Sequence, residues 1–271
     1  MKNRNILFYI ALAIAITLIC TAVFAPMLAP YDPQYMELSD KLQKPSGEHF
    51  LGTDHMGRDV FSRLIYGSRL SLSITFSIIV LNLLIGCPIG LIVGWYGGKV
   101  EKIFTWFANI ILAFPVFLLS MAFAGILGQG IGNIILAVVS VGWVYYARLL
   151  RNMVFNVKNC EYVLSAKAMG APSWYIMYRH ILPFVFKPVL IVALMNAGEI
   201  ILMISGFSFL GIGVQPNVAE WGMMLNDAKP YFRSIPELVL YPGMAIFITV
   251  LSFNLLGEYF EKKENVRLWE K

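Results

Sequence analysis

Few residues in this chain of 271 could do chemistry, and one of them lies inside an apolar stretch. Glu199 interrupts a run from 188 to 219 that otherwise lacks Asp, Glu, Lys and Arg. A charge in mid-membrane costs roughly 2.5–3.5 kcal/mol on insertion scales, so this carboxyl should face protein or water rather than lipid. Asn196 and Met203 lie about one helical turn to either side on the same face. These three residues either line a solute path or hold a buried carboxyl that is protonated or bonded to Asn196.

A second group of polar residues precedes the second apolar run. Asp54 stands four positions before Arg58, and Asp59 stands four positions before Arg63. On a helix this spacing allows the two carboxylates to pair with the two guanidinium groups. The four residues are therefore either a docking surface for another protein or a self-paired cap over the helix ends.

Metal binding is a further hypothesis for the same region. His49 and His55 accompany the two aspartates, and imidazole and carboxylate groups bind divalent ions. Thioether sulfur is a soft ligand, so a row of methionines could line a metal route, although methionine more often packs in cores. These residue types therefore do not identify a metal, which stays unknown. The methionines concerned are Met195, Met203, Met223 and Met224.

The sequence predicts no catalytic residue and no bound cofactor. The phosphate-binding pattern G-x-x-x-x-G-K-[ST] does not occur, and the glycine cluster at 125–132 lacks a lysine. No nucleophile and base stand at a recognisable spacing. The three cysteines, Cys20, Cys87 and Cys160, show neither disulfide nor zinc spacing. We expect neither an enzyme nor a nucleic-acid partner.

Composition indicates the elements that must position these residues. The chain is 58% hydrophobic and 14% charged, whereas a soluble domain has about a quarter of its residues charged. Runs without charge approach or exceed the roughly 20 residues that cross a bilayer. The run 103–147 would form a helix of about 68 Å, so it must fold back at its glycine cluster. The sequence predicts an all-α membrane protein with six helices, near 6–25, 71–95, 103–125, 131–147, 188–210 and 239–257.

The first of these helices could instead be a cleaved signal peptide. Its apolar stretch is longer than a typical signal core, and no small-x-small site closes it, which favours a permanent span. Basic residues indicate the orientation, because cytoplasmic loops are enriched in Lys and Arg. With the N-terminus inside, 14 of them fall on the cytoplasmic side and 7 outside. Both termini are therefore expected in the cytoplasm.

Small residues and prolines shape the predicted helices. Glycines recur every fourth residue from Gly86 to Gly98, which lets a neighbouring helix approach closely. This strip indicates either packing alone or a flexing bundle around a path. Pro88 and Pro115 are expected to kink their helices, since neighbours can satisfy the freed carbonyl groups.

The longest basic loop, 148–187, predicts a short helix, a stop at Gly170 and a second helix beginning near Pro172. Such a pair suits docking into a groove of a partner protein. It equally suits an amphipathic pair resting on anionic lipid. Residue types alone leave these two alternatives open.

The same loop resembles the cytoplasmic loop of permeases in binding-protein-dependent ABC importers. That pattern reads Glu-Ala-Ala, three residues, Gly, nine residues, then Ile-x-Leu-Pro, and here Leu164 and His180 depart from it. In that family the loop contacts the ATPase subunit. The resemblance implies the contact residues Glu161, Ser165, Ala166, Gly170, His180, Leu182 and Pro183.

Segments outside this loop resemble the C-type permeases of the dipeptide, oligopeptide and nickel importers. They include Leu51–Leu64, Gly67–Leu72, Ser208–Gly213 and Glu220–Gly222. The likeness covers essentially the whole chain. It implies an N-terminal helix with an extracellular segment over 1–69, a five-helix permease core over 70–258 and a cytoplasmic tail over 259–271.

The resemblance also implies partners and a location. We expect a multi-pass protein of the inner (cytoplasmic) membrane, beside a second homologous permease, two ATP-binding subunits that use the ATP, and an extracellular substrate-binding protein. In that setting the docking surface at 54–63 would serve the binding protein. The motifs lean toward nickel or a nickel chelate, with di- or oligopeptides as the alternative. A secondary transporter without ATPase partners, using Glu199 as a proton relay, is a competing class.

Overall fold

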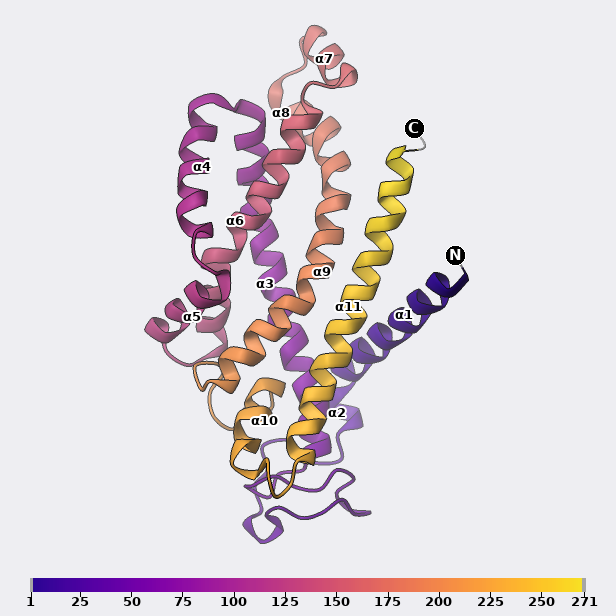
Figure 1. The fold of residues 1–271 in the computed structure, drawn as a ribbon, viewed down its shortest axis with the longest axis vertical. Coiled ribbons are helices and arrows are strands. Elements are labelled where there is room, and N and C mark those ends of the chain that lie inside the picture. The colour runs from indigo at the N-terminus through magenta and orange to yellow at the C-terminus, as the bar shows by residue number, and fades with distance from the viewer. Residues whose placement is uncertain (1, 270–271) are drawn as a thin grey trace. The chain divides into compact units, whose positions relative to one another are not determined.

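The computed structural model describes the backbone of residues 2–269 and the side chains of residues 5–263, and it is mainly helical (Figure 1). No strand occurs in the described range, where one isolated bridge joins Thr53 to Asp59. A π-helical turn, Met177–Ile181, links α8 to α9, and short 3-10 turns occur at Leu38–Asp40 and Lys229–Tyr231. The α-helices are α1 Lys2–Val23, α2 Ala25–Leu28, α3 Val60–Tyr96, α4 Gly98–Leu112, α5 Val116–Leu127, α6 Ile131–Val157, α7 Glu161–Ala168, α8 Ser173–Ile176, α9 Leu182–Phe209, α10 Trp221–Ala228 and α11 Glu237–Trp269.

Five of the described helical stretches are long and apolar enough to cross a membrane, and the number rises to six if a bent pair is counted as one span. The bent pair is α4 and α5, which meet at an angle of 81°. The break falls just before Pro115, whose nitrogen cannot donate a helical hydrogen bond. The predicted kink at Pro115 is therefore a full break in the helix. The predicted all-α membrane fold is confirmed.

The chain divides into two compact units. The first contains the chain up to Ser77, with Ala124–Ile135 and Leu194–Tyr259, and the second contains Ile78–Phe123, Leu136–Ala193 and the chain from Phe260 onward. Helices α3, α5, α6, α9 and α11 contribute residues to both units. The domain limits expected from the sequence follow membrane topology, a different criterion, and stay a prediction.

Close packing of α3 on α6 organises the second unit. A Cβ atom added at Gly86 would lie 2.7 Å from the carbonyl oxygen of Trp143, and one added at Gly94 would lie 2.7 Å from the Cβ of Val154. Real Cβ atoms do not approach so closely, so these positions need glycine for the helices to touch. The glycine strip thus serves packing. Gly98 is different, because it begins α4 at a φ of +57° with open space around it.

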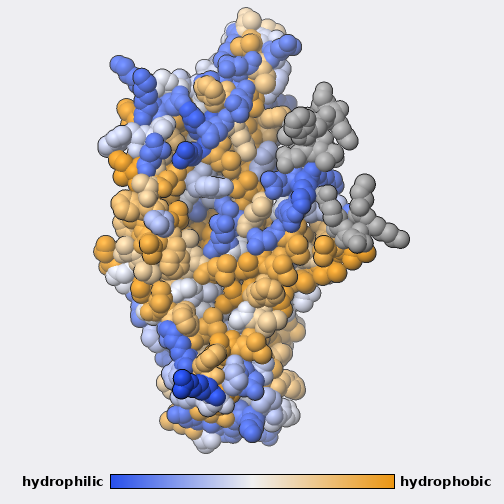
Figure 2. Space-filling view, in the orientation of Figure 1, coloured by the Kyte–Doolittle hydropathy of each residue, from blue (hydrophilic) through white to orange (hydrophobic). Residues whose placement is uncertain are grey.

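The N-terminal helix packs as part of the first unit. Ala11 and Ala15 of α1 are buried against Leu256 of α11, and the Ser252 hydroxyl donates to the Ala11 carbonyl at 2.7 Å. The remaining sides of α1 expose large apolar residues, and hydrophobic side chains gather over this helix in Figure 2. This is the surface expected of a helix that faces lipid on most sides.

Candidate functional site

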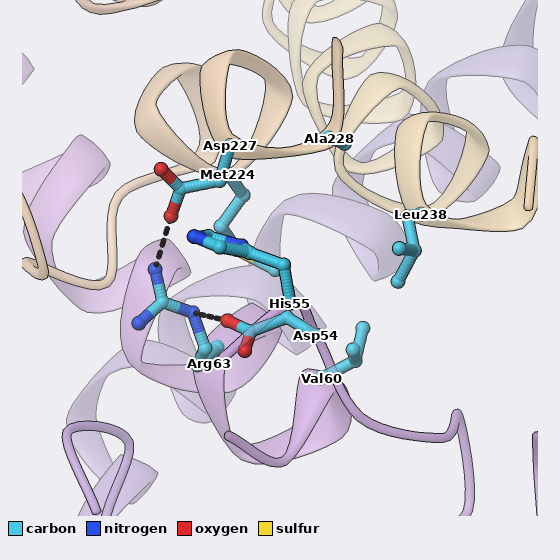
Figure 3. A pocket seen from close by; sticks show the side chains of 8 residues that line it. All are labelled: Asp54, His55, Val60, Arg63, Met224, Asp227, Ala228 and Leu238. Atoms are coloured by element: carbon cyan, nitrogen blue, oxygen red, sulfur yellow. Dashed lines mark hydrogen bonds and ion pairs between the residues drawn. The ribbon is translucent and has the colours of Figure 1, made fainter. Parts of the chain in front are cut away.

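An ion-pair network lies in the first unit, where the chain enters α3, and Figure 3 shows the ion pairs that Arg63 makes within it. Arg58 Nε donates to Asp54 Oδ2 at 2.7 Å, and Arg58 Nη2 donates to Asp227 Oδ2 at 2.8 Å. Arg63 approaches the same two carboxylates at 3.4 Å each. The predicted Asp54–Arg58 pair therefore forms, although it spans a turn before α3 rather than a helix. Asp227, at the end of α10, was not foreseen.

Asp59 does not make the pairing that its spacing suggested. Its Oδ1 lies 2.9 Å from His49 Nδ1, and its Oδ2 accepts from the Ser62 backbone at 2.7 Å. The second contact caps the N-terminus of α3, where backbone N–H groups lack helical partners. Arg63 is left to join the network around Asp54, because the capping role points the Asp59 carboxylate elsewhere.

These four predicted docking residues are buried. The exposed fraction is 1% for Arg58 and Arg63, 3% for Asp59 and 7% for Asp54. Such burial favours the self-paired cap, since a docking surface must offer its groups to solvent first. Their role as contacts for a binding protein stays a prediction.

The structure divides the predicted metal-binding group in two. His49 pairs with Asp59. His55, Asp54 and Asp227 each offer a potential ligand atom, and these three atoms lie within 4.8 Å of one another. A cavity of about 20 Å³, room for a single water, lies beside them. Two guanidinium groups already occupy the carboxylates and would repel a metal ion. The cluster is an ion-pair network first.

Glu220 holds α10, and hence Asp227, in place. Its carboxyl is fully buried and accepts from the backbone nitrogens of Gly222 and Met223, each at 2.9 Å, at the start of α10. The Ser71 hydroxyl of α3 donates to the same group at 3.2 Å. Burial raises the pKa of Glu220 despite these donors. A carboxyl just before a Trp-Gly helix start was the available signal for this capping role.

The predicted loop motif in the second unit folds as a helix, a glycine stop and a second helix. Helix α7 ends in a Schellman motif, in which Ala171 N donates to Ala166 O at 3.1 Å and Gly170 N donates to Lys167 O at 3.0 Å. Gly170 has a φ of +80°, a conformation that glycine adopts at little cost. The glycine predicted as a stop is confirmed in that structural role.

The second helix begins after Pro172 and contains a π-helical turn before Leu182. Pro183 follows directly and has no N–H to donate to a preceding carbonyl, a common cause of local helix irregularity. Within the turn, His180 lies edge-on to Tyr175 with ring centroids 5.7 Å apart. The motif positions 180, 182 and 183 thus shape the entry into α9.

One face of this loop is buried and the other carries exposed apolar residues. Val163, Ala166, Ile176 and Ile181 belong to the core of the second unit, while Glu161 and Ser165 are exposed. The exposed fraction reaches 81% for Met169, 67% for Trp174 and 70% for Tyr178. We call the outward-facing set the coupling face. It consists of Tyr162, Leu164, Met169, Trp174 and Tyr178.

Cationic side chains attach this segment to the C-terminal end of α3. Lys167 Nζ lies 4.3 Å from the ring centroid of Trp95, and Lys158 Nζ donates to the Gly94 carbonyl at 3.0 Å. Partial burial, with repulsion from Lys167 and Arg151, lowers the pKa of Lys158. The coupling face therefore sits on a segment anchored to a long helix.

The predicted path residues share α9 but differ in exposure. Glu199 is exposed at the surface of the single chain, and Asn196 and Met203 are half-buried. The carboxyl is thus not sealed inside this bundle. The methionines are mainly packing residues, since Met223 and Met224 are buried and Met195 contacts Gly257 closely.

Comparison with known proteins identifies this architecture. A family model described as "binding-protein-dependent transport system inner membrane component" matches residues 86–266, and one for the N-terminal transmembrane domain of oligopeptide transport permease C matches residues 3–45. The chain belongs to the binding-protein-dependent transport permeases. It is a multi-pass membrane permease of the ABC importer family.

Relatives of this permease transport different solutes, by their names. The chain is 38% identical to the nickel transport system permease protein NikC of Escherichia coli K12, covering 92% of this chain and 90% of that protein. It is 38% identical to the dipeptide permease DppC of Alkalihalophilus pseudofirmus, over 94% and 84%. It is 39% identical to the glutathione permease GsiD of Pectobacterium atrosepticum, over 89% and 80%. Near-equal identities leave the solute of this permease open.

Proposed function

We propose that this chain forms half of the translocation pathway of an ATP-driven importer and receives the motion of an ATPase subunit through its coupling face. The supporting observation is the exposed apolar and aromatic face of α7 and α8, held on an anchored helix pair. Aromatic side chains of this kind are typical centres of protein interfaces. A second permease, two ATP-binding subunits and a substrate-binding protein complete the proposed assembly.

Co-purification tests this proposal. The chain is tagged and extracted from its own membranes in mild detergent, and the bound proteins are identified by mass spectrometry. We expect a homologous permease and ATP-binding subunits whose ATP hydrolysis rises when the loaded binding protein is added. Recovery of the chain alone, with full transport activity after reconstitution, would contradict the proposal and favour an ATPase-independent transporter.

The proposed topology places α7 in the cytoplasm, and a native cysteine reports on it. Cys160 is exposed at the N-terminus of α7, Cys87 is buried, and Cys20 can be replaced by serine. A membrane-impermeant maleimide should label Cys160 only after the cells are permeabilised. Labelling in intact cells would place the coupling face outside and rule out an ATPase contact there.

For the transported solute we propose nickel or a nickel chelate, with di- or oligopeptides as the alternative. The motifs around Ser205–Gly211 and Ala219–Ala228 support this choice. The packed methionines add nothing to it. Uptake of radiolabelled nickel and of a labelled dipeptide is compared in a deletion strain with and without this gene, and the solute whose uptake the gene restores decides between them.

Glu199 is proposed to line the pathway, since it is exposed on the apolar helix α9. A charge at that position needs water, a solute or another chain around it. Glu199→Gln should therefore lower uptake at limiting solute, while membrane levels stay normal. Unchanged uptake would remove Glu199 from the pathway.

A further inference from the structure

A cleft of about 680 Å³ lies in the first unit, and its lining shares no residue with that of the small cavity beside the ion-pair network. Its volume is within the range of small-molecule sites, roughly 300–1,000 Å³. Three segments form its walls: the stretch after α2, the start of α3 and the residues just before Glu220. The lining includes both aromatic and charged side chains. The lining side chains of the first two segments include Tyr31, Asp32, Tyr66, Arg69 and Ser73.

The side of α3 that faces the cleft has the periodicity of one helical face. Tyr66, Arg69, Leu70 and Ser73 follow an i, i+3, i+4, i+7 pattern, so their side chains project in the same direction. Arg69 is exposed, and it makes no hydrogen bond or ion pair among the described residues. It stands directly before the charge-free stretch of α3, which begins at Leu70. An exposed guanidinium group therefore lies where the charge-free, membrane-spanning part of α3 begins.

The opposite wall carries a negative charge that is not paired with this arginine. Asp32 is exposed and lines the same cleft, and no ion pair joins the two residues within 4.0 Å. One oxygen of Asp32 accepts from the Gln34 backbone at 2.8 Å, which orients the carboxylate. The cleft thus offers separated charges of both signs to a ligand.

The wall that carries Asp32 is held rigidly against α3. The Tyr31 backbone donates to the Ser62 hydroxyl at 3.1 Å, and the Tyr31 hydroxyl donates to the Glu48 carbonyl at 3.0 Å. Arg63 Nη1 donates to the Pro33 carbonyl at 3.3 Å. Such support lowers the ordering cost when a ligand binds, because the charged groups are already placed.

We infer that this cleft receives the transported solute, and that the solute is a small dipolar compound with a carboxylate. Arg69 binds the carboxylate, since its planar donors match that group in a bidentate manner. Asp32 supplies the negative charge for the positive end, an ammonium group or a chelated metal. A short peptide and a metal aminocarboxylate chelate both fit this description, whereas a hydrated nickel ion lacks the carboxylate. The inference rests on the proposed importer function.

The test measures uptake by the full importer reconstituted with its binding protein in liposomes. The probe pairs are radiolabelled dialanine with its C-terminal amide, and radiolabelled nickel chelated by glycine or by glycinamide. For the pair that the wild type imports, Arg69→Gln should reduce uptake of the carboxylate probe at limiting concentration about tenfold, because charged hydrogen bonds contribute that much. The deficit should be much smaller for the amide probe, and Arg69→Lys should keep part of the activity.

Arg233→Gln is the matched control, since Arg233 is also an exposed arginine of the same unit but does not line the cleft. It should leave uptake within about twofold of wild type. Asp32→Asn keeps the acceptor for Gln34 and removes the charge, and it should lower uptake by a smaller factor of about three. Neither Arg69 nor Asp32 is buried, so the variants should fold.

Several outcomes overturn the inference. Arg69→Gln uptake equal to that of the Arg233 control removes the site, and an equal deficit for both probes removes the carboxylate. A lipid phosphate is the other anion that a guanidinium group binds at a membrane surface, so uptake is repeated with and without phosphatidylglycerol. A deficit present only with this anionic lipid assigns Arg69 to the headgroup. Failure of the wild type to couple uptake to ATP would instead refute the proposed importer function itself.

Discussion

The ion-pair network of the first unit, which we call the cap, buries charged side chains, whereas the coupling face of the second unit exposes apolar ones. In the cap, Arg58, Arg63 and Asp227 are drawn together, and both arginines are fully buried by contacts within the chain. In the coupling face, Met169 and Trp174 are apolar and yet mostly exposed. A buried charge needs a partner, and an exposed apolar side chain gains from one. The cap is therefore complete in a single chain, whereas the coupling face is suited to another molecule.

The largest expected effect comes from adding a charge to the segment that carries the coupling face, 161–181, which we call the coupling segment. Gly170→Glu should reduce solute uptake to background while the protein stays in the membrane, because a carboxylate would enter the proposed ATPase contact. Gly98→Glu is the matched control, since both glycines have positive φ and open space for a Cβ atom. Backbone strain of about 1–2 kcal/mol is common to both variants. Normal uptake by the Gly170 variant would mean that the ATPase contact does not include this position.

Breaking the cap should affect stability rather than coupling. Asp227→Ala leaves two buried guanidinium groups short of a carboxylate, and loss of one buried partner costs about 3–5 kcal/mol. Thermal unfolding of the detergent-solubilised protein should show a clear drop in melting temperature. Glu48→Ala, which removes an exposed carboxylate of the same unit, is the control. Equal melting temperatures for the two variants would mean that the network contributes little.

An exposed aromatic residue of the coupling face should show the reverse pattern. Trp174→Ala is expected to weaken ATPase co-purification by about 2 kcal/mol, the scale of an interface hot spot, with little change in melting temperature. Trp106→Ala on α4 is a close match, because the exposed fractions are 67% and 68%. Lipid, not a partner protein, is expected around Trp106. If both variants retain the ATPases equally, Trp174 lies outside the interface.

The smallest expected effect is on the pH dependence of stability, through Glu220 at the start of α10. Burial raises the pKa of Glu220, so the folded state binds its proton more tightly than the unfolded state. The stabilisation is present at low pH and is lost as pH rises above the ordinary glutamate pKa. Glu220→Gln should remove this decline in unfolding free energy, since glutamine does not titrate. Melting curves of the wild type and of Glu220→Gln at a series of pH values would show the difference. Parallel declines in the two proteins would mean that Glu220 does not cause the loss of stability.

Local patterns determined a large part of the structure. Apolar run lengths predicted the membrane helices, and the glycine and proline at 170 and 172 predicted the helix, stop and second helix of the coupling segment. The glycines of α3 predicted a close approach by a neighbouring helix, which the structure identifies as α6, although Gly98 begins the next helix instead. Each of these features depends on residues near in sequence or on a property of one helix face. The bend of 81° before Pro115 exceeded the expected kink, because the chain uses the proline to start a new helix.

The sequence by itself therefore determined the helical membrane fold, the family pattern and the helix, glycine stop and second helix of the loop 148–187, since hydrophobic run length and turn chemistry are local. Only the tertiary structure decided the pairing of charges. Asp227 is 169 residues from Arg58, and no spacing rule links them. The same holds for the cleft that joins Asp32 to Arg69. Which carboxylate meets which guanidinium depends on how distant segments pack, because the strength of an ion pair depends on distance in space and on burial, not on separation along the chain.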